Sequence, residues 1–174
     1  NSRSLPTVAN QKFHLDLWQQ PYSVSRYYLV ERWSDEHFEA LRPYLAALGR
    51  AGQRSVTAIL FYEPWGEQTH DLFDPMVQTT KKSNGSWEYD YTVFDKYVEL
   101  CAEYGIDKQI NCFSMVPWDM SFRYYDEATS SYKSINTTTG TSQYRELWTS
   151  FLTAFKAHLQ EKGWFEKTNI AMDE

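Results

Sequence analysis

The chain has 174 residues, enough for one domain with a substantial hydrophobic core but fewer than the roughly 250 of a complete eight-stranded βα barrel. Its 17 lysines and arginines against 23 aspartates and glutamates make it mildly acidic, with no basic stripe, so we expect no nucleic acid partner. No apolar stretch approaches about 18 residues and no charged and apolar leader opens the chain, so we expect no membrane span and a signal peptide, if any, already removed.

The first half of the chain predicts a strand, a helix and a second strand. Residues 12–18 alternate between apolar and polar side chains, as a half-buried strand does. Ser34 provides a capping hydroxyl for a helix, whose apolar residues recur at helical spacing until Gly49 and Gly52 end it. Residues 55–62 are almost continuously apolar, which is typical of a strand covered on both faces in a parallel sheet.

The second half continues the alternation of helices and strands. Residues 94–101 have helical spacing, 106–115 read as a strand, 144–159 as a long helix, and 169–172 as a short last strand. The resulting order, β-α-β-α-β-α-β, predicts a single α/β domain with a parallel sheet and right-handed crossovers. From length and order alone, it is either a compact α/β domain or a piece of a barrel.

The connections from strand to helix are unusually long. They cover residues 19–33, 63–91 and 116–142, whereas most loops in compact domains have about 4 to 6 residues. All three leave the carboxyl ends of predicted parallel strands, where ligands bind in barrels and in open α/β sheets. We therefore predict that this edge of the sheet carries the function.

Several kinds of site are not indicated. The chain has no glycine-rich phosphate loop and no Gly-x-Ser-x-Gly elbow. His70, Asp71 and Asp74 could supply metal ligands, but their spacing matches no established site, so we expect neither metal nor cofactor. Cys101 and Cys112 are too few for a disulfide framework and are predicted to be buried free thiols.

The last residues provide the strongest indication of chemistry. Asp173 and Glu174 follow directly on the last predicted strand. One carboxyl group can protonate a leaving group while its neighbour stabilises developing positive charge, as in glycosidases. Two alternatives stay open: such a dipeptide is common on solvated loops, and Glu63 could act as a conventional second carboxylate. Acids at a strand end, at the predicted functional edge, favour the catalytic interpretation.

Aromatic side chains make up 17% of the chain, and many lie in the long loops. Aromatic planes stack on sugar rings, while neighbouring polar side chains bond the hydroxyl groups. A single tryptophan more often packs in a core, but the same pattern recurs at the predicted strand ends. The predicted substrate-binding residues are Trp18, Tyr62, Trp65, His70, Trp118 and Asp119.

Three segments together resemble the catalytic barrel of glycoside hydrolase family 123, the β-N-acetylgalactosaminidases. They are residues 15–21 (LDLWQQP), 59–66 (ILFYEPWG) and 170–174 (IAMDE). The acidic pair is moderately specific, because family 20 hexosaminidases carry a similar pair. The resemblance implies a (β/α)8 TIM-barrel fold, of which residues 1–174 would be the amino-terminal half with about strands one to four. Such a half barrel has open edges, so we expect it to need the missing half or to self-associate.

The resemblance also implies a mechanism. In substrate-assisted retention the 2-acetamido oxygen of the sugar attacks the anomeric carbon and gives an oxazoline-like intermediate. Asp173 would orient that group, and Glu174 would protonate the leaving oxygen and then activate water. The implied substrate is a glycan or glycolipid with β-linked N-acetylgalactosamine, and we expect a secreted, periplasmic or cell-surface bacterial protein. The alternatives are a non-catalytic sugar-binding module and a structural half barrel that needs a partner.

Overall fold

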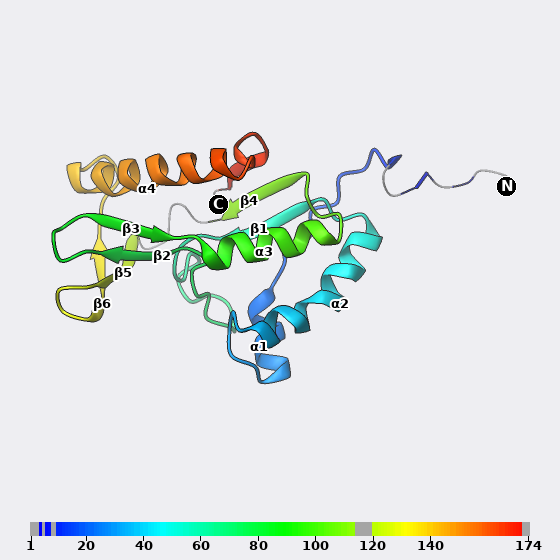
Figure 1. The fold of residues 1–174 in the computed structure, drawn as a ribbon, viewed down its shortest axis with the longest axis horizontal. Coiled ribbons are helices and arrows are strands. Elements are labelled where there is room, and N and C mark those ends of the chain that lie inside the picture. The colour runs from blue at the N-terminus through cyan, green and yellow to red at the C-terminus, as the bar shows by residue number, and fades with distance from the viewer. Residues whose placement is uncertain (1–3, 5, 8–9, 114–119, 172–174) are drawn as a thin grey trace.

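In the computed structural model, the described part of the chain comprises residues 4, 6–7, 10–113 and 120–171. It folds into helices and two separate sheets (Figure 1). In chain order the elements are α1 Pro21–Tyr28, α2 Asp35–Ala51, β1 Ser55–Ile59, β2 Gln78–Lys81, β3 Trp87–Asp90, α3 Thr92–Glu103, β4 Gln109–Phe113, β5 Ser121–Asp126, β6 Ser131–Asn136, α4 Ser142–Glu161, the 3-10 helix η2 Phe165–Lys167 and β7 Thr168–Ala171.

Three of the predicted strands form a parallel sheet in the order β1-β4-β7. Ser55 of β1 pairs with Gln109 of β4, and Ile110 of β4 pairs with Thr168 of β7. β1 and β4 are shorter than predicted and lie within the predicted ranges, whereas β7 begins one residue earlier than predicted. Because all three run in the same direction, their carboxyl ends share one edge, which we refer to as the carboxyl edge.

The predicted half of a TIM barrel is wrong. The four long-loop strands β2, β3, β5 and β6 form a second sheet in the order β3-β2-β5-β6, which mixes antiparallel and parallel pairs. It lies at one end of the molecule, with α1 and α2 toward the other (Figure 1). The described chain is therefore an α/β fold with a three-stranded parallel sheet and a four-stranded mixed sheet, rather than four successive barrel strands.

The predicted first strand is also missing. In residues 12–18, the ladder is reduced to one isolated parallel bridge, between Leu15 and Gln53. At Gln19, hydrogen bonds that involve side chains replace the backbone ladder. The Gln19 Oε1 accepts from the Thr57 backbone N at 2.6 Å, and the Gln19 backbone N donates to Thr57 Oγ1 at 3.2 Å. The side chains of Gln19 and Thr57 thus join the chain after this segment to β1, which the alternation of apolar residues could not reveal.

The predicted helices are confirmed, with one change at the end of α2. Ser34 caps α2 by accepting a hydrogen bond from the His37 backbone N at 3.2 Å. The helix continues through Gly49 to Ala51, and only Gly52, with φ of 98°, ends it in the left-handed conformation. Gly49 was expected to help end the helix but is a buried interior residue.

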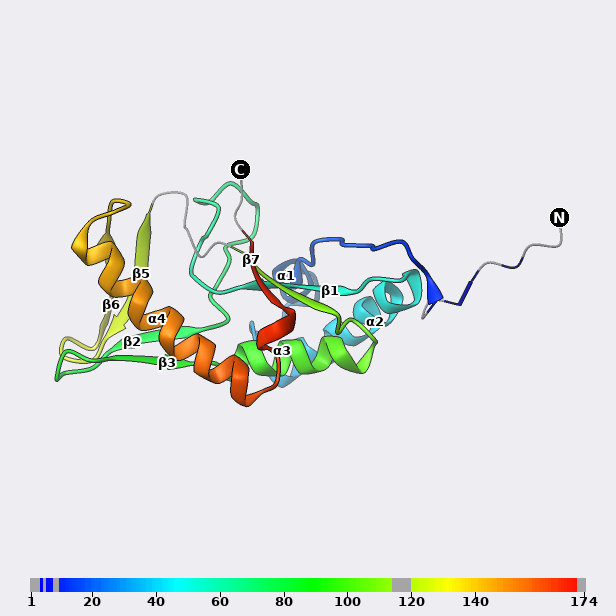
Figure 2. The same cartoon turned by 90° about the horizontal axis from the view of Figure 1, so that it is seen from above.

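Helix α4 packs against the chain that follows β1, against the second sheet and against α3. Trp148 and Phe151 pack against Phe61, which follows β1, and Trp148 also contacts Phe122 of the second sheet. Toward its other end, Phe155 meets Phe94 of α3. Figure 2 shows this path, with α4 running from the second sheet to α3.

The two cysteines are confirmed as free and buried. Burial raises the pKa of the Cys101 thiol to about 12, and it also raises the pKa of Cys112. Neither thiol is therefore suited to act as a nucleophile near neutral pH. Within the described residues, no helix is both long and apolar enough to cross a membrane.

Candidate active site

An aromatic cluster lies where β1 and β4 end at the carboxyl edge. Ala171, the last residue of β7, packs against it. In the sequence, Asp173 and Glu174 come two and three residues after Ala171. Both acids lie outside the described residues, as do Trp118 and Asp119. The buried members of the cluster are Tyr22, Ile59, Trp65, Phe73 and Phe113.

Trp18 is the exposed member of this aromatic group. Its ring stacks on Trp65 with 5.9 Å between centroids and 18° between planes, and it lies 4.5 Å from the Phe113 ring. Half of the residue (50%) remains exposed. Packing on one side holds the indole in place while other parts of it stay accessible, which is the arrangement a sugar platform requires.

Trp65 has a different role. Only 7% of it is exposed, and besides Trp18 it contacts Phe73 and Phe113. Its indole Nε1 has no hydrogen-bond partner among the described residues. The two tryptophans predicted at this edge are in contact, and Trp65 packs beneath Trp18 rather than offering an exposed surface of its own.

Glu63 closes the loop that follows β1. Its carboxylate accepts hydrogen bonds from the backbone N of Phe73 and, at 3.1 Å, from the backbone N of Glu67. Its own backbone N donates to the Phe73 carbonyl at 3.0 Å. Burial raises the pKa of this carboxyl, which the two hydrogen bonds partly oppose. Both oxygens are therefore used to shape the loop, which argues against Glu63 as a second catalytic carboxylate.

Tyr62 and His70 lie on the same loop as Glu63, but they contact residues outside the aromatic cluster. The Tyr62 ring is covered by the guanidinium of Arg123, 4.1 Å from the ring centroid. His70 has 81% of its side chain exposed, and its Nδ1 lies 3.8 Å from Asp71 Oδ1. In the part of the chain that the structure describes, no three His, Cys, Asp or Glu side chains are grouped so that they could hold a metal ion.

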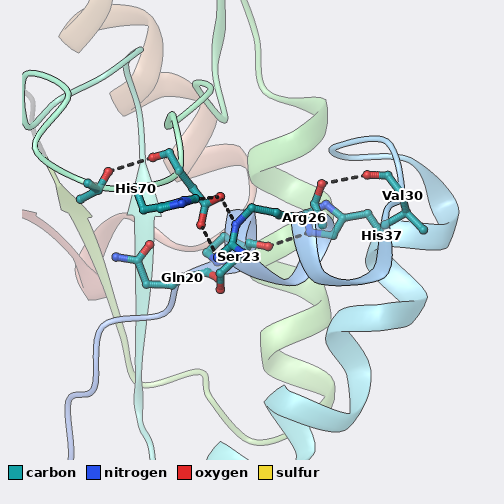
Figure 3. Close-up of polar contacts among 10 residues, drawn as sticks. Gln20, Ser23, Arg26, Val30, His37 and His70 are labelled. Atoms are coloured by element: carbon teal, nitrogen blue, oxygen red, sulfur yellow. Dashed lines mark hydrogen bonds and ion pairs between the residues drawn. The ribbon is translucent and has the colours of Figure 1, made fainter.

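Helix α1, which the sequence did not reveal, braces this loop. Arg26 donates to both carboxylate oxygens of Asp71, at 2.6 and 3.3 Å, and faces the loop that carries His70 (Figure 3). The hydrogen bond from Arg26 lowers the pKa of Asp71. Tyr22 adds a bond from its hydroxyl to the Asp74 carbonyl at 2.6 Å. The loop after β1 is thus held at both ends, by Glu63 and by α1.

His37 anchors α1 to α2. The ring is fully buried; its Nδ1 accepts from the Trp33 backbone N at 3.0 Å, and its Nε2 lies 2.9 Å from the Pro21 carbonyl, visible in Figure 3. Because Nδ1 must accept, the bonds fit the neutral ring with its proton on Nε2. Burial lowers the pKa of His37, with Arg32 contributing in the same direction.

This burial predicts a pH dependence of stability. Between its lowered folded pKa and the unfolded value of about 6.5, His37 is protonated only in the unfolded state, so stability should fall as pH drops below about 6.5. The limit is about 1.4 kcal/mol per pH unit for one group. We expect denaturant unfolding at pH 7.5 and 5.5 to show a smaller loss for His37→Gln than for wild type. His70→Gln, at an exposed position, should lose as much stability between pH 7.5 and 5.5 as wild type does. If His37→Gln lost as much as wild type, His37 would not be the source of the pH dependence.

The structure also contains a cleft that the sequence did not predict. It has a volume of about 600 Å³ and lies between the loop before α2 and the second sheet. Trp33, Tyr62, Arg123 and Tyr132 contribute to its walls. Arg123 and Tyr132 come from β5 and β6, which were interpreted as one long loop. The alternation SFRYYD in β5 was the signal that could have placed Arg123.

Comparisons with known proteins agree with this geometry. The model of the glycoside hydrolase 123 catalytic domain matches residues 18–174. A solved family 123 glycoside hydrolase from Clostridium perfringens, studied for glycolipid glycan hydrolysis, is similar with a TM-score of 0.91 and 38% identity. The match covers 97% of this chain and 30% of that one. The curated proteins gave no match. By the extent of the family match, the chain belongs to glycoside hydrolase family 123.

Proposed function

We propose that this chain is part of a retaining glycoside hydrolase that removes β-linked N-acetylgalactosamine with the help of the 2-acetamido group of the substrate. The observation that carries the proposal is the place of the acidic pair in the sequence, just after β7. Asp173 and Glu174 follow β7 in the sequence, and β7 ends against the aromatic cluster that holds the exposed ring of Trp18. Since the chain spans 30% of its solved relative, the activity is proposed for the longer protein.

The roles of the two acids follow from the chemistry. The acetamido oxygen attacks the anomeric carbon while the bond to the leaving oxygen breaks, and Glu174 gives that oxygen its proton. Asp173 orients the acetamido N–H and stabilises the positive charge of the oxazolinium ring. Glu174 then takes a proton from water as the water opens the ring, which restores the enzyme and retains the anomeric configuration.

The hydrogen bonds of Glu63 support a nucleophile that belongs to the substrate rather than to the protein. A conventional retaining enzyme needs a second free carboxylate about 5 to 5.5 Å from the acid. Glu63, the candidate considered for that role, has both oxygens engaged by backbone N–H groups of its own loop. An acetamido group carried by the substrate makes a second carboxylate nucleophile unnecessary.

The test is hydrolysis by the complete enzyme. It should release N-acetylgalactosamine from an aryl β-glycoside with retention and should be inhibited tightly by a thiazoline analogue of the intermediate. The 2-deoxy substrate, which lacks the acetamido group, should be cleaved far more slowly. Equal cleavage of the 2-deoxy sugar, or a covalent sugar adduct trapped on Glu63, would exclude substrate assistance.

The platform predicts an effect of Trp18. Trp18→Ala should raise KM about tenfold, because an aromatic contact of roughly 1.4 kcal/mol is lost. Trp18→Tyr, which keeps a flat ring, should recover most of the affinity. Tyr27→Ala removes an aromatic side chain that is 74% exposed on α1 and serves as the matched control. An unchanged KM in Trp18→Ala would show that this indole only packs.

A further inference from the structure

The cleft between the loop before α2 and the second sheet contains an arginine whose guanidinium donors bond no residue that the structure describes. Arg123 of β5 lies between two tyrosines, with its guanidinium carbon 4.1 Å from the Tyr62 ring centroid and 4.7 Å from that of Tyr132. Among residues 10–113 and 120–171, the Arg123 side chain makes these ring contacts but no hydrogen bond or ion pair, while its backbone pairs with Ser134 of β6. By contrast, Arg26 and Arg32 each pair with an aspartate.

This arrangement leaves the edge of the guanidinium available. A guanidinium has five N–H donors in its plane, and rings stacked on its faces do not use them. Arg123 lines the cleft of about 600 Å³ and also a second hollow of about 300 Å³, which Glu63 and Glu67 line as well. Tyr62 borders both cavities too, so the Arg123–Tyr62 pair stands at their junction.

The charges of the cleft favour a neutral ligand with hydroxyl groups. Besides Arg32 and Arg123, its walls include Glu31, Asp74 and Asp90. An anionic ligand would meet more carboxylates than guanidinium groups, whereas hydroxyl groups can donate to carboxylates and accept from Arg123. Its volume lies within the roughly 300 to 1,000 Å³ of small-molecule sites.

The cleft and the candidate active site both use residues from the start of the loop that follows β1. Tyr62 lies three residues beyond β1, and Trp65, three residues later, supports the Trp18 platform. Glu63 fixes the conformation between them through its bonds to Glu67 and Phe73. If the cleft also binds a sugar, a glycan bound at Trp18 runs past Tyr62 toward Arg123.

We infer that this cleft is a second sugar-binding subsite, which holds a neutral sugar of the leaving group through Arg123, Tyr62 and Tyr132. The inference rests on the proposed glycosidase function only in identifying the bound sugar as part of the leaving group. Binding of a sugar in the cleft does not depend on turnover. Arg123 is then a specificity-determining residue rather than a catalytic one. It recognises what is attached to the N-acetylgalactosamine.

Kinetics with two substrates test the inference. In the complete enzyme, Arg123→Ala and Tyr132→Ala should each lower kcat/KM at least tenfold on an oligosaccharide that ends in β-linked N-acetylgalactosamine. On an aryl glycoside, which has no sugar in its leaving group, they should leave kcat/KM within twofold. Arg145→Ala, an exposed arginine of α4, is the control and should change neither. Equal losses on both substrates, or no loss on the oligosaccharide, would overturn the subsite.

Direct binding separates this inference from the proposed activity. Calorimetric titration of the complete protein with lactose and with sialyllactose should show binding of the neutral lactose that Arg123→Ala weakens at least fivefold. Tyr132 is 55% exposed, so Tyr132→Ala should weaken binding with little effect on thermal unfolding. No binding of lactose, or binding that Arg123→Ala leaves unchanged, would overturn the subsite even if the enzyme is active. Tighter binding of sialyllactose than of lactose would contradict the inference that the cleft selects a neutral sugar.

Discussion

Replacing Glu174 by glutamine is expected to lower kcat on substrates with poor leaving groups by a factor of about 10² to 10⁴, the usual contribution of general acid-base catalysis. The loss should be smaller on an activated aryl glycoside, because an aryloxide needs little help from an acid. Asp173→Asn should instead impair both substrates, by roughly 3 to 4 kcal/mol if it resembles the loss of one preorganised stabilising group. Steady-state rates on the two substrates provide the measurement.

The control is Glu166→Gln, which neutralises an exposed acid in η2, a few residues before the pair. It should leave both rates unchanged. If Glu174→Gln were equally impaired on both substrates while Asp173→Asn retained activity on either, the roles assigned to the two acids would be wrong. The difference between substrates, rather than the size of either loss, is therefore decisive.

The sequence predicted the parts of the fold that depend on periodicity. The helices α2, α3 and α4 and the strands β1, β4 and β7 were found because their apolar residues recur at helical spacing or in short buried runs. Their parallel pairing followed from the order of the elements. These features are local or follow from general rules of chain connection, so one sequence is enough to reveal them.

The second sheet was missed because its strands are short and polar. β2 (QTTK) has no fully buried side chain, and most of β6 (SYKSIN) is exposed, so neither produces an apolar pattern. The turn between β2 and β3 contains Asn84-Gly85, with Gly85 at φ of 87°, which is a strong hairpin signal. These residues were predicted to lie in one long loop, 63–91, although the turn chemistry indicated a hairpin.

The candidate site was predictable in its location more than in its contacts. Strand ends and long loops pointed to the carboxyl edge, and Trp18 and Trp65 do meet there. Which of the two is exposed depends on packing against Phe113, which is distant in sequence. The use of Glu63 as a loop brace depends on backbone N–H groups, which carry no signature in the sequence.

At Gly49, helix propensity and tertiary packing have opposite effects on the stability of an alanine variant. In an exposed helix, replacing glycine by alanine would stabilise by about 1 kcal/mol. Gly49 is buried in α2, however, and a Cβ added to it would lie 2.1 Å from the backbone oxygen of Tyr104. Such a contact is far too short, and relieving it requires the backbone at the end of α3 to move away.

We expect Gly49→Ala to destabilise the protein by about 3 kcal/mol, at the upper end of the usual cost of overpacking, since a backbone atom rather than a flexible side chain must yield. Denaturant unfolding at pH 7.5 provides the free energy. Ala47→Gly, at an exposed position in the same helix, is the matched control and should cost only about 1 kcal/mol through helix propensity. A Gly49→Ala protein as stable as wild type would mean that α2 does not approach Tyr104 so closely. A large loss in that variant alone would show that this glycine is required by the contact between α2 and the end of α3.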